Sequence, residues 1–148
     1  MSQLTVQTTV DISASAQDAW RLFGEGFGEW ADWAPGIDSS ELQGELKQGV
    51  IRVNKAESLG TVTQELVRYE PEGRALAYEM REGLPPFFHS VRNDWEIKEI
   101  EPGKIRLEGT ALFDLKDDAE KMKEQLQGKM GMVLEVFANA FRDKLQAS

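Results

Sequence analysis

The chain has 148 residues, 41% of them hydrophobic, which is enough for one hydrophobic core and favours a single domain over residues 1–148. Its 26 acidic and 17 basic residues give a formal net charge of −9, which would repel phosphate backbones and anionic lipid surfaces, so we expect no nucleic-acid partner. The absence of cysteine excludes disulfides, thiolate zinc sites and a cysteine nucleophile.

The N-terminal segment predicts a half-buried strand followed by short helices. The strand is indicated by residues that share one parity, with mostly polar residues between them: Leu4, Val6, Thr8, Val10 and Ile12. Ser13 or Ser15 can cap a short helix of two or three turns whose apolar face ends at Gly24. Residues 25–36 contain three glycines, two tryptophans and Pro35, which indicates irregular or short helical structure pinned by aromatic anchors.

The first ten residues are polar and alternating, without a basic stretch followed by an apolar run. They predict neither a signal peptide nor a membrane-spanning segment. We therefore expect a cytoplasmic protein.

Turn-forming residues at regular intervals between residues 37 and 100 predict an antiparallel sheet. Glycines and prolines divide this stretch into segments of strand length: Gly44, Gly49, Gly60, Pro71, Gly73, Gly83, Pro85 and Pro86. Pro102 and Gly103 then turn the chain into a last strand of about residues 104–115.

The C-terminal part predicts one long amphipathic helix from about residue 117 to 146, roughly 45 Å in length. Asp117 and Glu120 offer a capping box at its start. Gly128 and Gly131 each cost about 1 kcal/mol relative to alanine in a helix, so they indicate close packing, a slight bend or room for a ligand. The apolar stripe consists of Ala119, Met122, Leu126, Met130, Val133, Leu134, Phe137, Ala138, Phe141 and Leu145.

This order of strand, short helices, strands and long helix is that of an α+β fold. Together with several short motifs, it resembles the helix-grip superfamily of SRPBCC-type domains, which includes START domains, birch-pollen-allergen-like proteins and polyketide cyclase/dehydrase-like domains. The motifs are Ile12, Ala14 and Ala16 with Ala19-Trp20, Trp30 to Pro35 with Gly36-Ile37, Gly49 to Val53, Gly60 to Leu66, Tyr69 to Pro71 and Glu82 to Pro86.

The resemblance covers nearly the whole chain. It implies a curved seven-stranded antiparallel sheet wrapped around the long C-terminal helix, with two short helices after the first strand and a hydrophobic ligand cavity between sheet and helix. Functions in the superfamily range over lipid transport, hormone sensing, ring cyclisation and co-chaperone activity, so this fold does not determine the function.

Strand alternation predicts which side chains face the implied cavity, because successive residues point to opposite sides of a sheet. On the third strand it turns Arg52 and Asn54 outward. The residues expected to bind a ligand are Val53, Lys55, Val62, Gln64, Leu76, Tyr78, Met80, His89, Asn93, Trp95 and Phe113, with Met130, Leu134 and Phe137 from the helix.

Two segments are candidates for a gate over the cavity. One lies in the aromatic stretch after the short helix, and the other is the loop from Gly83 to Phe88, whose prolines stiffen it and whose phenylalanines offer apolar contact area. The alternative for this loop is a rigid strand connection. The gate residues are Trp33, Pro35, Leu84, Pro85, Pro86 and Phe87.

His89 is the single histidine, so it is the best general acid or base if the protein is an enzyme, and otherwise a structural or surface residue. One histidine without cysteine makes a zinc site unfavourable, and helix capping explains Asp114, Asp117 and Asp118, so we expect neither metal nor cofactor. We expect the arginines on the strands to pair with carboxylates on the outer face of the sheet. The alternative is that Arg81 or Arg92 turns to the cavity mouth and holds a carboxylate of the ligand. The strand arginines are Arg52, Arg68, Arg74, Arg81 and Arg92.

The predicted function is binding of a small hydrophobic molecule, polyketide-like, lipid or steroid-like, held chiefly by apolar burial. One alternative is a polyketide cyclase or dehydratase that uses His89 for proton transfer. The other is a co-chaperone-like module whose sheet binds another protein. We expect a monomer or a weak homodimer.

Overall fold

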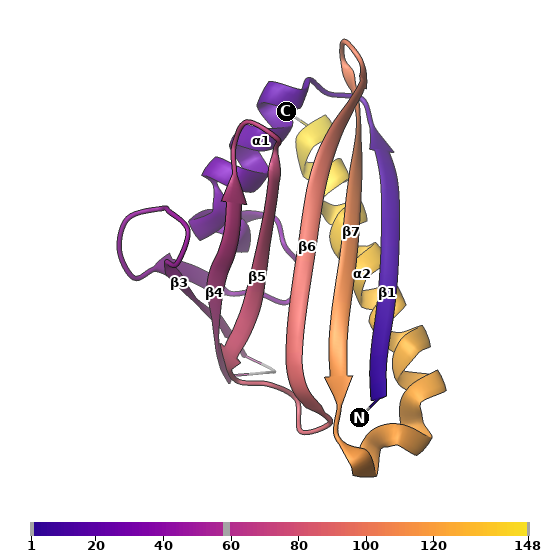
Figure 1. The fold of residues 1–148 in the computed structure, drawn as a ribbon. Coiled ribbons are helices and arrows are strands. Elements are labelled where there is room, and N and C mark those ends of the chain that lie inside the picture. The colour runs from indigo at the N-terminus through magenta and orange to yellow at the C-terminus, as the bar shows by residue number, and fades with distance from the viewer. Residues whose placement is uncertain (1, 58–59, 148) are drawn as a thin grey trace.

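The computed structural model describes residues 2–57 and 60–147, and it has a curved antiparallel sheet wrapped along one long helix (Figure 1). The strands are β1 (Ser2–Ile12), β2 (Ser39–Leu42), β3 (Ile51–Ala56), β4 (Gly60–Glu70), β5 (Ala75–Glu82), β6 (Phe88–Glu101) and β7 (Lys104–Leu115). The helical elements are α1 (Ala16–Trp20), η1 (Arg21–Glu25), η2 (Phe27–Asp32), η3 (Asp117–Met122) and α2 (Lys123–Gln146). The seven strands lie in the order β1-β7-β6-β5-β4-β3-β2, which confirms the predicted α+β helix-grip architecture.

The N-terminal elements follow their sequence pattern. Leu4, Val6 and Ile12 of β1 are buried, and this strand pairs antiparallel with β7. Ser15 is the N-cap of α1, where its hydroxyl accepts a hydrogen bond from the Asp18 backbone N–H at 3.0 Å. The π-helical η1 continues α1, and the 3₁₀-helical η2 follows Gly26, so short helices cover residues 16–32 as expected.

The long helix is present, but the capping box is wrong. Its first residues form the 3₁₀ turn η3, whose N-cap is Lys116, and no side chain caps that end. Asp117 lies inside the turn and therefore cannot occupy the cap position, while the Glu120 carboxylate accepts a hydrogen bond from Ser2 Oγ at 3.2 Å. From there α2 packs along β1 and β7 (Figure 1).

The two helix glycines are not close-packed. A Cβ atom built on Gly128 or Gly131 would meet no heavy atom within 4 Å outside the local helix backbone. Close packing is therefore not the reason for either glycine, and nothing in the structure explains them.

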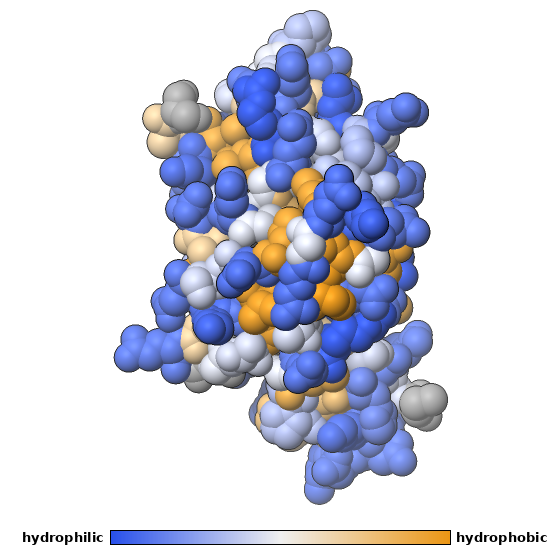
Figure 2. Space-filling model, turned by 90° about the vertical axis from the view of Figure 1, so that its left-hand side faces the viewer, coloured by the Kyte–Doolittle hydropathy of each residue, from blue (hydrophilic) through white to orange (hydrophobic). Residues whose placement is uncertain are grey.

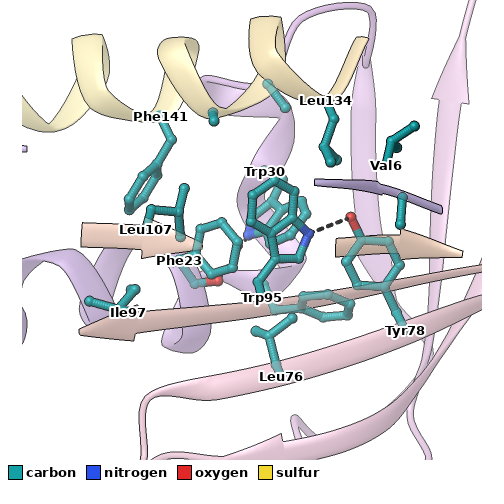
Figure 3. Close-up of a cluster of buried hydrophobic side chains, with 14 of the residues drawn as sticks. Val6, Phe23, Trp30, Leu76, Tyr78, Trp95, Ile97, Leu107, Leu134 and Phe141 are labelled. Atoms are coloured by element: carbon teal, nitrogen blue, oxygen red, sulfur yellow. Dashed lines mark hydrogen bonds between the residues drawn. The ribbon is translucent and has the colours of Figure 1, made fainter. Parts of the chain in front are cut away.

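Aromatic rings fill the space between the short helices, the sheet and α2 (Figure 3). Trp30 is buried, and its indole N–H donates to the Phe23 carbonyl at 2.9 Å. Trp95 donates to the Tyr78 hydroxyl at 3.3 Å and covers Gly109 so closely that a Cβ there would lie 2.3 Å from its ring. Buried Trp30 is a core anchor, as predicted for the aromatic stretch, and Trp20 is buried in the same core.

Candidate functional site

A cavity of about 280 Å³ lies between α2 and the β3–β6 part of the sheet. The helix packs on β1 and β7 at one side, while η2 and residues 36–37 close part of the other. The residues that line the cavity are Trp30, Gly36, Ile37, Arg52, Asn54, Ala56, Val62, Gln64, Tyr78, Met80, Asn93, Trp95, Val133, Leu134 and Phe137.

Strand alternation correctly predicted many of the residues in the cavity wall. The predicted binding residues that line the cavity are Val62, Gln64, Tyr78, Met80, Asn93, Trp95, Leu134 and Phe137. The structure thus brings together side chains from β4, β5, β6 and α2. Binding by these residues stays a prediction.

Six other expected binding residues lie outside the cavity lining. Leu76 and Phe113 are buried in the hydrophobic core, and Met130 is partly buried against it. The remaining three do not line the cavity: Val53 and Lys55 lie on the opposite face of β3 from the one predicted, and His89 lies at an irregularity of β6.

The predicted side-chain direction on β3 is wrong. Arg52 lies directly opposite Gln64 of β4, and residues opposite each other in an antiparallel ladder project from the same face. Inward Gln64 therefore places Arg52 inward too, and Asn54 with it, whereas Lys55 is exposed on the outer face. The prediction took the apolar Ile51 and Val53 as the cavity face, whereas polar Arg52 and Asn54 face the cavity on this strand.

The expected position of His89 is also wrong. The pairing of β6 with β7 shifts between Phe88 and Ser90, so His89 is an extra residue on β6 and its side chain is exposed. Phe88 is buried in its place. Beyond the bulge the predicted parity is restored, and Asn93 and Trp95 face the cavity. Proton transfer by His89 inside the cavity is therefore not supported.

Arg52 is the charged cavity residue that strand alternation placed on the wrong face. Its side chain is only 1% exposed, and its Nε and Nη2 atoms donate to Gln64 Oε1, with an Nε–Oε1 distance of 3.0 Å. Its Nη1 donates to the Phe27 carbonyl at 2.9 Å. The guanidinium carbon lies 3.8 Å from the centroid of the Phe27 ring and 4.2 Å from that of the Trp30 ring.

The amide of Asn54 and the hydroxyl of Ser40 extend this polar cluster. Asn54 Nδ2 donates to Gln64 Oε1 at 3.1 Å, and Ser40 Oγ donates to Asn54 Oδ1 at 2.7 Å. Each of these groups therefore has a hydrogen-bond partner, as polar groups in a buried wall require. The wall is held from three neighbouring strands, β2, β3 and β4.

The charge on Arg52 has no carboxylate partner among residues 2–57 and 60–147. Burial lowers the pKa of Arg52 to about 10, and its interaction with Tyr78 opposes this change only in part. Arg52 is therefore still charged at neutral pH. Burial also raises the pKa of Tyr78, although Arg52 and Trp95 act in the opposite direction, so the phenol is neutral there.

The other strand arginines differ from Arg52. Arg68, Arg81 and Arg92 form ion pairs with carboxylates such as Glu65, Glu79 and Asp94, as predicted for the outer face. Arg74 forms no ion pair within the described part of the chain. Neither Arg81 nor Arg92 lines the cavity, so the cavity arginine is one that the sequence analysis had placed outside.

An apolar groove of about 430 Å³ adjoins the cavity at α2, and Gly36, Val133 and Phe137 line both. The remaining groove residues are Pro35, Lys129, Met132 and Val136. Apolar surface also gathers near mid-height within hydrophilic surroundings on the side drawn in Figure 2.

The two predicted gate segments lie in different places. Pro35 lines the groove, and Trp33 packs behind it, with its ring centroid 4.8 Å from that of Phe137. The second segment lines neither the cavity nor the groove, and the Phe87 carbonyl accepts a hydrogen bond from the Lys116 backbone N–H at 2.9 Å. This geometry favours the alternative of a rigid connection for Leu84, Pro85, Pro86 and Phe87.

Within the described residues, no cluster of three or more histidine, aspartate or glutamate side chains is placed to hold a metal ion. Over the same residues, no helix is both long and apolar enough to cross a membrane.

Solved structures with the same fold come from bacteria and a plant. A protein from Thermobifida fusca is 27% identical, with a TM-score of 0.77 and coverage of 95% of this chain and 92% of that one. The Zhui aromatase/cyclase from Streptomyces sp. R1128 is 20% identical, with a TM-score of 0.77 and coverage of 98% and 94%. Norcoclaurine synthase from Thalictrum flavum, in complex with dopamine and hydroxybenzaldehyde, is 17% identical, with a TM-score of 0.78 and coverage of 99% and 88%.

Curated proteins provide no match to this chain. The family model described as "Polyketide cyclase / dehydrase and lipid transport" matches residues 3–145, nearly the full length. This match agrees with the helix-grip fold and with the cavity between its sheet and its long helix. The chain therefore belongs to the polyketide cyclase/dehydrase and lipid transport family.

Proposed function

We propose that this protein binds one small, largely apolar molecule in the cavity between the sheet and α2. The observation that carries the proposal is the cavity itself, whose apolar lining surrounds a few fixed polar groups on Arg52, Asn54 and Gln64. Small-molecule sites commonly combine apolar burial with a few such groups. The complex of norcoclaurine synthase with dopamine and hydroxybenzaldehyde supports the proposal, because a protein of the same fold holds small aromatic molecules.

Native mass spectrometry of the purified protein, followed by solvent extraction, tests this proposal. A stoichiometric apolar adduct is the expected result, and its identity would define the ligand class. Ala56→Phe is the decisive variant, because Ala56 lines the cavity and a phenyl ring there would fill it. Lys55→Phe is the matched control, since Lys55 is exposed on the other face of the same strand. An adduct that survives Ala56→Phe unchanged would contradict binding in this cavity.

The second candidate function is a cyclase or dehydratase, and it now depends on Tyr78 instead of His89. The Tyr78 phenol lines the cavity, is neutral at neutral pH and lies beside the cationic Arg52. Such a pair can donate a proton and stabilise negative charge that develops on a carbonyl oxygen. With the extracted ligand and its linear precursor as substrates, an enzyme would lose turnover in Tyr78→Phe while it keeps ligand affinity within a few fold. A carrier shows no turnover in either form.

The third possibility, a protein-interaction module, predicts a nearly filled interior and a large exposed apolar patch. The cavity of about 280 Å³ argues against the first expectation, whereas exposed Met132, Val133 and Val136 agree with the second.

A further inference from the structure

The buried charge of Arg52 is the feature of the cavity that the binding proposal leaves unexplained. Removal of a guanidinium from water costs several kcal/mol unless an opposite charge compensates it. Gln64 and the Phe27 carbonyl accept hydrogen bonds from Arg52, but both acceptors are neutral. Among the described residues that line the cavity, Arg52 is the only one with a charged side chain. The cavity is therefore positive, and no side chain among the described residues that line it supplies an opposite charge.

Arg52 still has donors for a ligand. A guanidinium carries five N–H groups, and the three hydrogen bonds to Gln64 and Phe27 use three of them. One of the two remaining N–H groups interacts with Tyr78, so one is left for a bound molecule. A carboxylate on the ligand would accept a charge-assisted hydrogen bond from it and neutralise the buried charge.

The apolar groove lies a short distance from this charge. The Trp30 ring separates the two, since its centroid lies 4.2 Å from the guanidinium carbon and 5.1 Å from the centroid of the Phe137 ring. Phe137 borders both the cavity and the groove. A chain that starts at Arg52 and passes Trp30 therefore leaves the cavity at Phe137 and enters the groove.

The groove itself exposes apolar side chains that a folded protein normally covers. Met132 is 68% exposed, Val133 55% and Val136 53%, and all three line the groove on one side of α2. An apolar chain from the cavity would cover them, because the groove and the cavity share part of their lining.

We infer that the cavity and the groove together bind one elongated amphipathic monocarboxylate, with its carboxylate at Arg52 inside the protein and its apolar chain in the groove. This inference rests on the proposed function, and it adds the chemical class of the ligand and its direction. A lipid held with its polar group outside and its chain inside would have the opposite orientation.

The first experiment measures the affinities of decanoate and 1-decanol by calorimetry, below their aggregation concentrations. Wild-type protein and Arg52→Met are compared with Arg92→Met, which removes the same charge from the outer face of the sheet. The two probes share the same apolar chain, so the ratio of their affinities measures the contribution of the carboxylate alone. We expect Arg52→Met to reduce the preference for decanoate about tenfold or more, because the ligand carboxylate loses its charge-assisted hydrogen bond to the guanidinium. We expect Arg92→Met to leave it unchanged.

The outcomes separate the two proposals. If both probes bind but Arg52→Met leaves their ratio unchanged, the binding function stands and the inference is overturned. If neither probe binds to the wild-type protein, the inference is overturned, while the adduct found by native mass spectrometry still decides the binding function. If Arg52→Met does not fold, Arg52→Lys takes its place as a variant that retains the charge. It should keep most of the preference for decanoate over 1-decanol.

The second experiment tests the direction of the ligand in the wild-type protein. Decanoate that carries a nitroxide at its methyl end should broaden the NMR methyl signals of Val133 and Val136 more than that of Ala56, which lies inside the cavity. The reverse pattern would overturn the orientation. Val136→Gln should weaken binding of dodecanoate about fivefold relative to hexanoate, because only the longer chain reaches the groove. Leu112→Gln, an exposed apolar site on β7, is the matched control.

Discussion

Arg52 and Gln64 lie opposite each other on β3 and β4, and their side chains meet beside the cavity. The two residues depend on each other in different ways. Gln64 compensates a buried charge, whereas Arg52 supplies donors to a neutral amide that also accepts from Asn54. Loss of Gln64 should therefore cost more stability than loss of both residues together.

We predict that Gln64→Leu lowers the free energy of unfolding by about 2–3 kcal/mol, because the buried guanidinium loses the acceptor of two hydrogen bonds. The double variant Arg52→Met/Gln64→Leu should recover most of this loss. Urea denaturation of the wild type, both single variants and the double variant forms the required cycle. Strictly additive effects would show that the two side chains do not interact.

At the scale of elements, β7 and α2 each contain glycine, with opposite consequences. Gly109 lies opposite Trp95 in the sheet, and the indole ring occupies the space that a Cβ would need. Gly128 lies on α2 with open space around it. The glycine on β7 thus positions a cavity-lining tryptophan, whereas the glycine on α2 only lowers helix propensity.

We predict that Gly109→Ala destabilises the protein by about 2–3 kcal/mol, because Trp95 must move from its packed position. The displaced indole should also weaken ligand binding in the cavity. Gly128→Ala, the matched substitution, should stabilise the protein by about 0.5–1 kcal/mol. Chemical denaturation gives both changes, and destabilisation by Gly128→Ala would indicate a contact or a bend that the structure does not show.

The bulge on β6 is a second element-scale feature with a functional consequence. It turns His89 to the outside while Asn93 and Trp95 keep their cavity positions. His89→Ala should therefore leave both ligand affinity and stability nearly unchanged. A loss of affinity greater than about threefold, measured by calorimetry, would contradict the exposed position of the imidazole.

At the scale of the whole molecule, a positive cavity lies inside a protein with a formal net charge of −9. The long-range field of the surface repels an anion that approaches, while Arg52 attracts it once it is inside. Salt screens the first effect much more than the second, because buried charges are screened much less than exposed ones.

We predict that the association rate constant of decanoate rises about twofold between roughly 0.01 M and 0.3 M salt, as screening reduces the surface repulsion. The association rate constant of 1-decanol should change little. This uncharged probe is the control for the effect of salt on apolar association. Stopped-flow tryptophan fluorescence reports both, since Trp30 and Trp95 line the cavity. A decanoate rate that falls with salt would mean that the cavity entrance is locally positive.

Local patterns along the chain were sufficient for the α+β order of elements and for part of the site, while the sheet wrapped around the helix and the cavity followed from the family resemblance. Alternation predicted β1, glycine and proline turns separated the strands, and the three- and four-residue spacing predicted α2. These signals depend on neighbours within a few residues, so they can be read without a partner strand. The same alternation placed Tyr78 and Met80 correctly, because the inward face of β5 is apolar apart from the phenol.

The tertiary structure decided the chemistry of the cavity. The position of Arg52 depends on its pairing with Gln64 across two strands, and the position of His89 depends on a bulge against β7. Both are relations between distant segments, so no period within one segment contains them. Hydrophobic patterns also assume that a buried face is apolar, and this assumption fails where a charged residue lines a site. The amino-acid sequence therefore specified a helix-grip fold with a cavity, whereas strand register and one bulge determined that an arginine, and not a histidine, faces it.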